Sequence, residues 1–388
     1  GIGTTNPDPA VGVGNTAKLS VGIVSAYQLY GDGSALTGIS AGFEADSNCN
    51  LIAGHCAGTC AGATPSTFNI IIGCGAGCFN GNGEHNVVMG THAGLCAVGA
   101  RRNVLIGMCA GSGVNNGKCN VYLGNYAGAK QYCSDNVAIG CEALCGHSTA
   151  SNNTGTHNIA IGKASGKSIC SGDNNVTIGC GAGMNLTSGT YNIFIGKGAA
   201  GTCTVTGSRN IVIGCDAGQK FTSTNNTIAI GYHAMGNAVN TSTNVIAIGP
   251  YAGRNLTSGQ ENIFIGQYTG KCTTDGGANI AIGNAAGCRN VSGINNIYIG
   301  KYSGSTQTAG NRNIAIGCVA NFPVTDGSCQ LVIGHESNRF FYGCCSGGRT
   351  LIGISTDYPD NAVGAALTSK LSVGIISAYQ LYGDGSNL

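Results

Sequence analysis

The 388-residue sequence is poor in charge, in proline and in long apolar segments. Charged residues make up 9% of the chain, against about 25% in ordinary globular proteins, and there are only 6 prolines. Few prolines, and no glycine at every third position, exclude collagen. No apolar run approaches the roughly 20 residues of a membrane-spanning helix, and no basic stripe indicates a nucleic-acid partner. A net charge of +2 and recurring Ile and Val argue against disorder.

Glycine is abundant, with 68 residues, and many of these glycines recur at a fixed spacing. They end an Asn-Ile-x-Ile-Gly motif, and the final glycine of each motif is called the anchor below. Eleven of the fifteen gaps between anchors are 17 residues long, and the others are 16, 22, 18 and 18. Such a spacing predicts an all-β fold, a parallel β-solenoid (β-roll) of about 17-residue coils with insertions at one corner. The anchors are Gly73, Gly90, Gly107, Gly124, Gly140, Gly162, Gly179, Gly196, Gly214, Gly231, Gly249, Gly266, Gly283, Gly300, Gly317 and Gly334.

Each position of the repeat has its own chemistry. The residues three and one before the anchor are always aliphatic, and because they share one face of a strand we expect them inside the coil. Thirteen of the sixteen residues four before the anchor are Asn, which predicts a ladder of stacked amides. The anchor itself is expected at a tight corner with positive φ. The residue three after it is always small, which suggests a second corner.

The middle residue of Ile-x-Ile should then point outward, and it is apolar at all but one position. A strand that is apolar on both faces is usually buried on both, so we expect the outer stripe to be covered. A homotrimer of parallel solenoids is the preferred cover; packing of the stripe against a loop of the same chain is the alternative. The stripe includes Ile71, Val88, Leu105, Tyr122, Phe194, Val212, Phe264, Tyr298 and Val332.

The two ends of the chain are related. Residues 1–36 and 353–388 align without a gap, with 26 of 36 identical. We therefore expect a connector at 1–40, the solenoid at 41–352, and at 353–388 the start of a second connector, so that modules continue end to end in a filament. The alternative is a pair of related caps on one solenoid.

Twenty-one cysteines suggest disulfides between stacked coils, because equivalent positions on adjacent coils lie about 4.8 Å apart, within disulfide reach. The candidates are Cys60, Cys78, Cys96, Cys272 and Cys288. Such bonds would imply an oxidising exterior; buried free thiols at corners are the alternative. We expect no metal site and no cofactor, since Cys-x-x-Cys is absent and the histidines do not pair at ligand spacing.

We expect no catalysis either. The Asp and Glu residues are scattered, whereas a polysaccharide-cleaving solenoid needs carboxylates paired across a groove. The run 279–287, Asn-Ile-Ala-Ile-Gly-Asn-Ala-Ala-Gly, resembles the repeats of trimeric autotransporter adhesin heads and of bacteriophage tail fibres. The opening residues 1–7 and the segments 18–21 and 31–38 are similar to connector motifs of marine phage tail fibres. The resemblance implies a trimeric β-roll that serves as a shaft or adhesin.

Together these patterns predict a structural fibre, extracellular on a cell surface or a virion, with a mechanical role and some capacity for surface attachment. A glycan-binding adhesin or receptor-binding module is the first alternative, although the corner loop 146–156 lacks the aromatic cluster that would favour it. A polysaccharide-degrading tailspike is the less favoured one. The expected partners are further copies of the chain and a cell-surface glycan, without membrane insertion and without nucleic acid.

Overall fold

The structure, a computed structural model, describes residues 45–58, 66–78, 83–146, 153–336, 338–346, 349–354 and 371–372. These residues form strands and turns, and no helix among them could cross a membrane. The predicted connectors at 1–40 and 353–388 fall almost wholly outside this part of the chain. The strands are β1 Leu51–Ala53, β2 Ile70–Ile72, β3 Val87–Met89, β4 Val104–Ile106, β5 Val121–Leu123, β6 Val137–Ile139, β7 Ile159–Ile161, β8 Val176–Ile178, β9 Ile193–Ile195, β10 Ile211–Ile213, β11 Ile228–Ile230, β12 Ile246–Ile248, β13 Ile263–Ile265, β14 Ile280–Ile282, β15 Ile297–Ile299, β16 Ile314–Ile316, β17 Gln330–His335, β18 Asn338–Ser346, β19 Arg349–Ile354 and β20 Leu371–Ser372.

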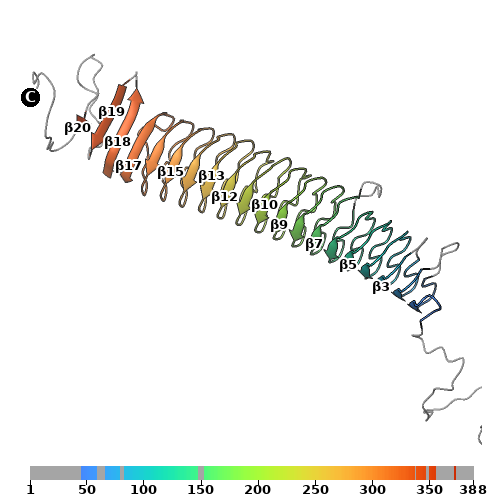
Figure 1. Ribbon diagram of the computed structural model, residues 1–388. Helices are drawn as coiled ribbons and strands as arrows, with labels where there is room; N and C mark the ends of the chain where they lie inside the picture. The colour runs from blue at the N-terminus through green and yellow to red at the C-terminus, as the bar shows by residue number, and fades with distance from the viewer. Residues whose placement is uncertain are drawn as a thin grey trace, which may run out of the picture. The chain divides into compact units, whose positions relative to one another are not determined.

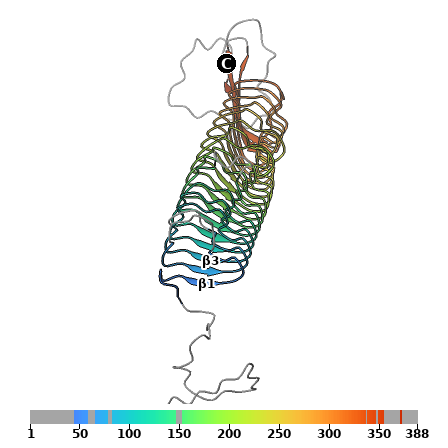
Figure 2. The ribbon, with the colours of Figure 1, turned by 90° about the vertical axis from the view of Figure 1, so that its right-hand side faces the viewer.

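The predicted parallel β-solenoid is confirmed. From β1 to β17 each strand pairs in parallel with the next, so that one coil, or rung, stacks on another (Figure 1). The register repeats without a slip: Ile211 lies opposite Ile228, and Ile228 opposite Ile246. Viewed from the side, the coils overlie one another (Figure 2). After β17 the pairing changes from parallel to antiparallel: β17 pairs antiparallel with β18, and β18 antiparallel with β19.

The anchor glycines are required for two reasons. The anchors from Gly73 to Gly317 have φ between 122° and 136°, a backbone region that side chains with a Cβ rarely adopt. They also stack directly on one another, so a Cβ on Gly214 would lie 2.6 Å from the carbonyl oxygen of Gly231. The positive φ and the close stacking both require glycine at the corner that follows each strand. The predicted corner is therefore confirmed.

The asparagines form the predicted ladder inside the corner that precedes each strand. The Asn69 backbone N–H donates to Oδ1 of Asn50 (2.9 Å), and Nδ2 of Asn69 donates to the same oxygen (3.0 Å). The same Nδ2 also donates to the carbonyl oxygen of Gly83 on the next rung (2.9 Å). Because these groups are buried, each amide satisfies backbone that water cannot reach. The left-handed backbone falls on the residue before the Asn, such as Tyr191 before Asn192.

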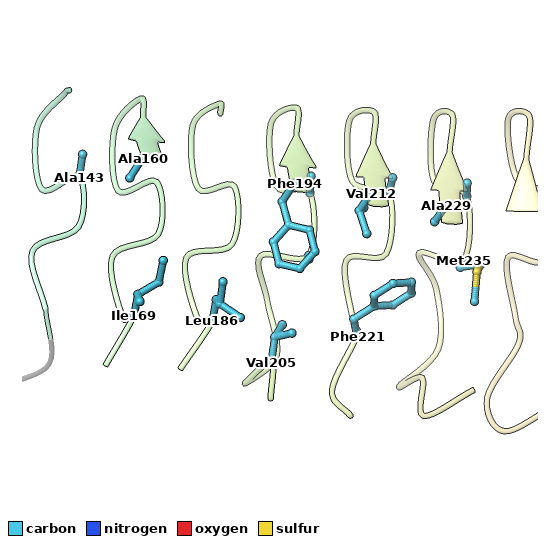
Figure 3. Close-up of a cluster of buried hydrophobic side chains, with 14 of the residues drawn as sticks. Ala143, Ala160, Ile169, Leu186, Phe194, Val205, Val212, Phe221, Ala229 and Met235 are labelled. Carbon is cyan, nitrogen blue, oxygen red and sulfur yellow. The ribbon is translucent and has the colours of Figure 1, made fainter. Parts of the chain in front are cut away.

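The prediction of which strand face points inward was wrong. The middle residues are the buried core: Val88, Leu105, Tyr122, Phe194, Val212 and Val332 are 0% exposed, and Ile71, Phe264 and Tyr298 are 1–2% exposed. They cannot be an oligomer stripe. Figure 3 shows Phe194 and Val205 pointing into the same coil interior from its two sides, with Phe221 in the interior of the next coil. The residues before and after the middle one lie outside instead.

The physical reason is the small space inside a coil. The residue three after the anchor is small and buried, as at Ala217 and Ala252, and this leaves room for the middle side chain of the strand. Around Tyr298 the neighbours are small: Tyr298 lies between Ala281 and Ala315, and its ring fills the space above Gly287, where a Cβ would come within 2.5 Å. This exchange of volume between rungs is what close packing of an interior requires.

Candidate interaction surfaces

The outward side of the strands is an apolar surface, here called the strand face. It consists of the residues three and one before each anchor, which are aliphatic on all sixteen rungs. Ile193 and Ile282 are both 37% exposed, and the other members are half-buried or exposed to a similar degree. Single exposed aliphatic residues are ordinary, but a continuous double column along sixteen rungs exceeds what isolated soluble proteins usually present.

A second surface follows each anchor and is called the turn face: the exposed side chains of the six residues after the anchor glycine. The second and fifth of these residues are neighbours, as shown by Arg254 lying over the Tyr251 ring (5.1 Å) and Lys271 over the Tyr268 ring (5.1 Å). Because the repeat is in register, equivalent turn residues form columns along the solenoid.

Aromatic rings stack in one of these columns. The rings of His233 and Tyr251 are 5.8 Å apart at 7°, and those of Tyr251 and Tyr268 are 5.1 Å apart at 5°. Tyr232 meets His233 edge-on at 4.3 Å and is 46% exposed. This cluster is not evident in the linear sequence, because its members are one repeat apart and form a group only when adjacent rungs are aligned.

Four charged or titratable pairs connect side chains on neighbouring described rungs. Nζ of Lys167 donates to Oε2 of Glu142 at 2.7 Å, and this hydrogen bond lowers the pKa of the Glu142 carboxyl. Arg101 lies 3.7 Å from Glu84. The His233 ring lies 4.0 Å from the Asp216 carboxylate, an ion pair only when the ring is protonated. These carboxylates thus face cations or imidazoles on neighbouring rungs.

The structure brings the candidate cysteines of adjacent coils together. The Cys96 backbone N–H donates to the carbonyl oxygen of Cys78 (3.0 Å), and that of Cys272 donates to Cys288 (3.0 Å). Cys96, Cys272 and Cys288 carry free thiols here. Cys78 is not one of the free thiols, and Cys60 lies outside the described residues. The disulfides between coils therefore stay a prediction, for cysteines whose backbones are hydrogen-bonded neighbours.

Two buried titratable groups, Cys133 and Tyr122, lie in the rungs next to the 16-residue gap. Burial raises the pKa of the Cys133 thiol to about 12, and the thiol donates to Oε1 of Gln131 (3.2 Å). Burial also raises the pKa of the Tyr122 phenol, which lies in the same interior. In the part of the chain that the structure describes, no three His, Cys, Asp or Glu residues gather closely enough to bind a metal ion.

Comparison with known proteins does not assign this chain to a family. No family model, curated protein or solved structure matches this chain significantly. The likeness to adhesin heads and tail fibres therefore remains a resemblance carried by the repeat motif. What the chain does must be argued from its two exposed surfaces.

Proposed function

We propose that this chain is the shaft of an extracellular or virion fibre, with a mechanical rather than catalytic role, in which parallel copies associate through their strand faces. The observation that carries the proposal is the unbroken aliphatic strand face. Covering it removes apolar area from water, at about 25 cal/mol for each Å². Stable interfaces use about 20–30 residues on each side, and sixteen rungs with two aliphatic residues each supply a comparable number.

Three copies are the proposed number. The strand face is one face of each solenoid, and a closed ring of three about a common axis lets every copy cover its own face with its neighbours. Copies that lie parallel and level match rung to rung, which suits a surface whose chemistry does not change along its length. The adjacent Cys272 and Cys288 support a rung-to-rung disulfide in the oxidising exterior where such a fibre works.

Sedimentation velocity and light scattering of the full chain test the association. The expected mass is three times the 38.6 kDa of one chain. Replacing Ile193, Ile228 and Ile263 of the strand face by Lys should yield a folded monomer, because three buried cations would have no partner. The matched control replaces Val239, Val291 and Ile294 by Lys. These residues are exposed but lie off the strand face, so this variant should keep the wild-type mass. A monomeric wild type, or an Ile→Lys variant that keeps its assembly, would refute the proposal.

A further inference from the structure

The turn face contains a run of cations without acidic partners. Five successive turn segments, 232–237, 250–255, 267–272, 284–289 and 301–306, contain Arg254, Lys271, Arg289 and Lys301 and no Asp or Glu. None of the four forms an ion pair with a described residue. The chain as a whole is nearly balanced, with 18 basic and 16 acidic residues, so this surface is positive only because folding aligns residues one repeat apart.

Aromatic rings contact three of these four cations. Arg254 and Lys271 lie over the stacked rings of Tyr251 and Tyr268, and Lys301 lies 5.6 Å from the Tyr302 ring centre. A cation over an aromatic face is attracted to it, by roughly 0.5–1 kcal/mol at exposed sites. Arg254 and Lys271 are therefore oriented before any ligand arrives, and because they occupy the same turn position on adjacent rungs they lie about 4.8 Å apart along the axis.

We propose that the turn face from Tyr232 to Lys301 binds an acidic polysaccharide, whose carboxylate or sulfate groups meet these cations along the axis of the solenoid. Arginine binds such oxyanions through paired N–H donors, while the exposed edges of Tyr232 and Tyr302 can bond sugar hydroxyls. A linear polymer fits because the surface is itself a line of repeating positions. The proposal goes beyond the shaft role and does not depend on association of the strand faces.

The ring geometry favours a polysaccharide over a single-stranded nucleic acid. Nucleic-acid grooves of low sequence specificity use free aromatic faces on which bases stack. Here Tyr251 is stacked between His233 and Tyr268, so both of its faces are occupied by the protein's own rings. The cations remain accessible, whereas the two faces of Tyr251 are not free to stack on a base.

Isothermal titration calorimetry of the full chain tests the site, with polygalacturonate, neutral dextran and single-stranded oligo(dT) as probes. We expect polygalacturonate to bind, with an affinity that falls as NaCl is raised, and dextran not to bind. The double variant Arg254→Gln/Lys271→Gln should bind at least about tenfold more weakly, since each basic residue near an anionic surface contributes on the order of 1 kcal/mol.

The matched control is Arg209→Gln/Arg312→Gln, which removes the same charge from two exposed corner residues that precede the strands. It should change the affinity less than about twofold, because these residues lie off the turn face. The site would be refuted by absence of polygalacturonate binding, by tighter binding of oligo(dT), or by an equal loss in the control. Sedimentation of the same variants keeps this result separate from the shaft proposal, because the strand face is unchanged.

Discussion

The inward and outward faces of the strands are both almost entirely apolar, but only the inward face is buried. In β10, Val212 is fully buried, while Ile211 and Ile213 on either side are partly exposed. Inward side chains range from Ala to Tyr, whereas outward ones are almost all Ile or Val. The difference shows that hydrophobicity alone does not define the core of a narrow coil. Variation in side-chain size does, because only the interior has a fixed volume to fill.

The largest expected effect breaks the inward face. Val212→Asp places a carboxylate where no water or partner is available, and we expect more than about 4 kcal/mol of destabilisation or failure to fold. The matched variant Ile213→Asp, one residue along on the outward face, should fold with a circular dichroism spectrum like the wild type. Urea unfolding of both proteins compares the two faces directly. An equal loss in the free energy of unfolding of both variants would contradict the assignment of one face as buried and the other as exposed.

A smaller effect is expected at the polar part of the interior. Asn192→Ala removes the amide that donates to Asn175 and Gly207 and accepts from Asn210 (3.0–3.1 Å). Buried polar groups left without hydrogen-bond partners cost about 1–3 kcal/mol each. We therefore expect urea unfolding to show a free energy of unfolding that is lower by roughly 3–5 kcal/mol.

Rungs that lack the asparagine supply the control for this prediction. Thr227 and Val245 occupy the ladder position on two successive rungs. Thr227→Ala interrupts no amide-to-amide bond and should cost less than Asn192→Ala. A larger cost at Thr227 would contradict the stabilising role given to the ladder.

The smallest effect concerns thiol chemistry and needs no mutation. With its pKa raised to about 12, the Cys133 thiol stays protonated and buried at pH 8, whereas exposed Cys74 should react with iodoacetamide. The raised pKa also has a stability consequence. The stabilisation of the fold that comes from keeping the Cys133 thiol protonated is fully present below the unfolded pKa near 8.5. It is lost as pH rises toward about 12. Mass spectrometry of the labelled peptides checks the first part; alkylation of Cys133 at the rate of Cys74 would contradict it.

Much of the fold could be predicted from the sequence. The anchor spacing indicated the rungs, and the Asn positions indicated the ladder, because both depend on identity repeated in register. The inward direction could not be read from alternation, since Ile211, Val212 and Ile213 are all apolar. The available clue was the exchange of size between neighbours, such as Ala281, Tyr298 and Ala315.

The turn face was harder to predict. Tyr251, Arg254, Tyr268 and Lys271 are unremarkable in a linear reading, and the net charge hides them. Their proximity depends on the depth of each corner and on exact alignment of rungs, which the repeat length alone does not give. Alignment of the turns by their anchors, column by column, would have brought the aromatic and basic positions together.

The antiparallel end has a consequence for how such a molecule changes size. At β17 the run of parallel pairings gives way to the β17–β18–β19 hairpins, so a further coil cannot simply be laid on that end. Lengthening that keeps this end intact requires duplication of a repeat further along the column, away from β17. Each such duplication would add one layer of about 4.8 Å and leave the β17–β19 end unchanged. The length of the column would therefore change in whole steps, with the number of repeats that the gene encodes.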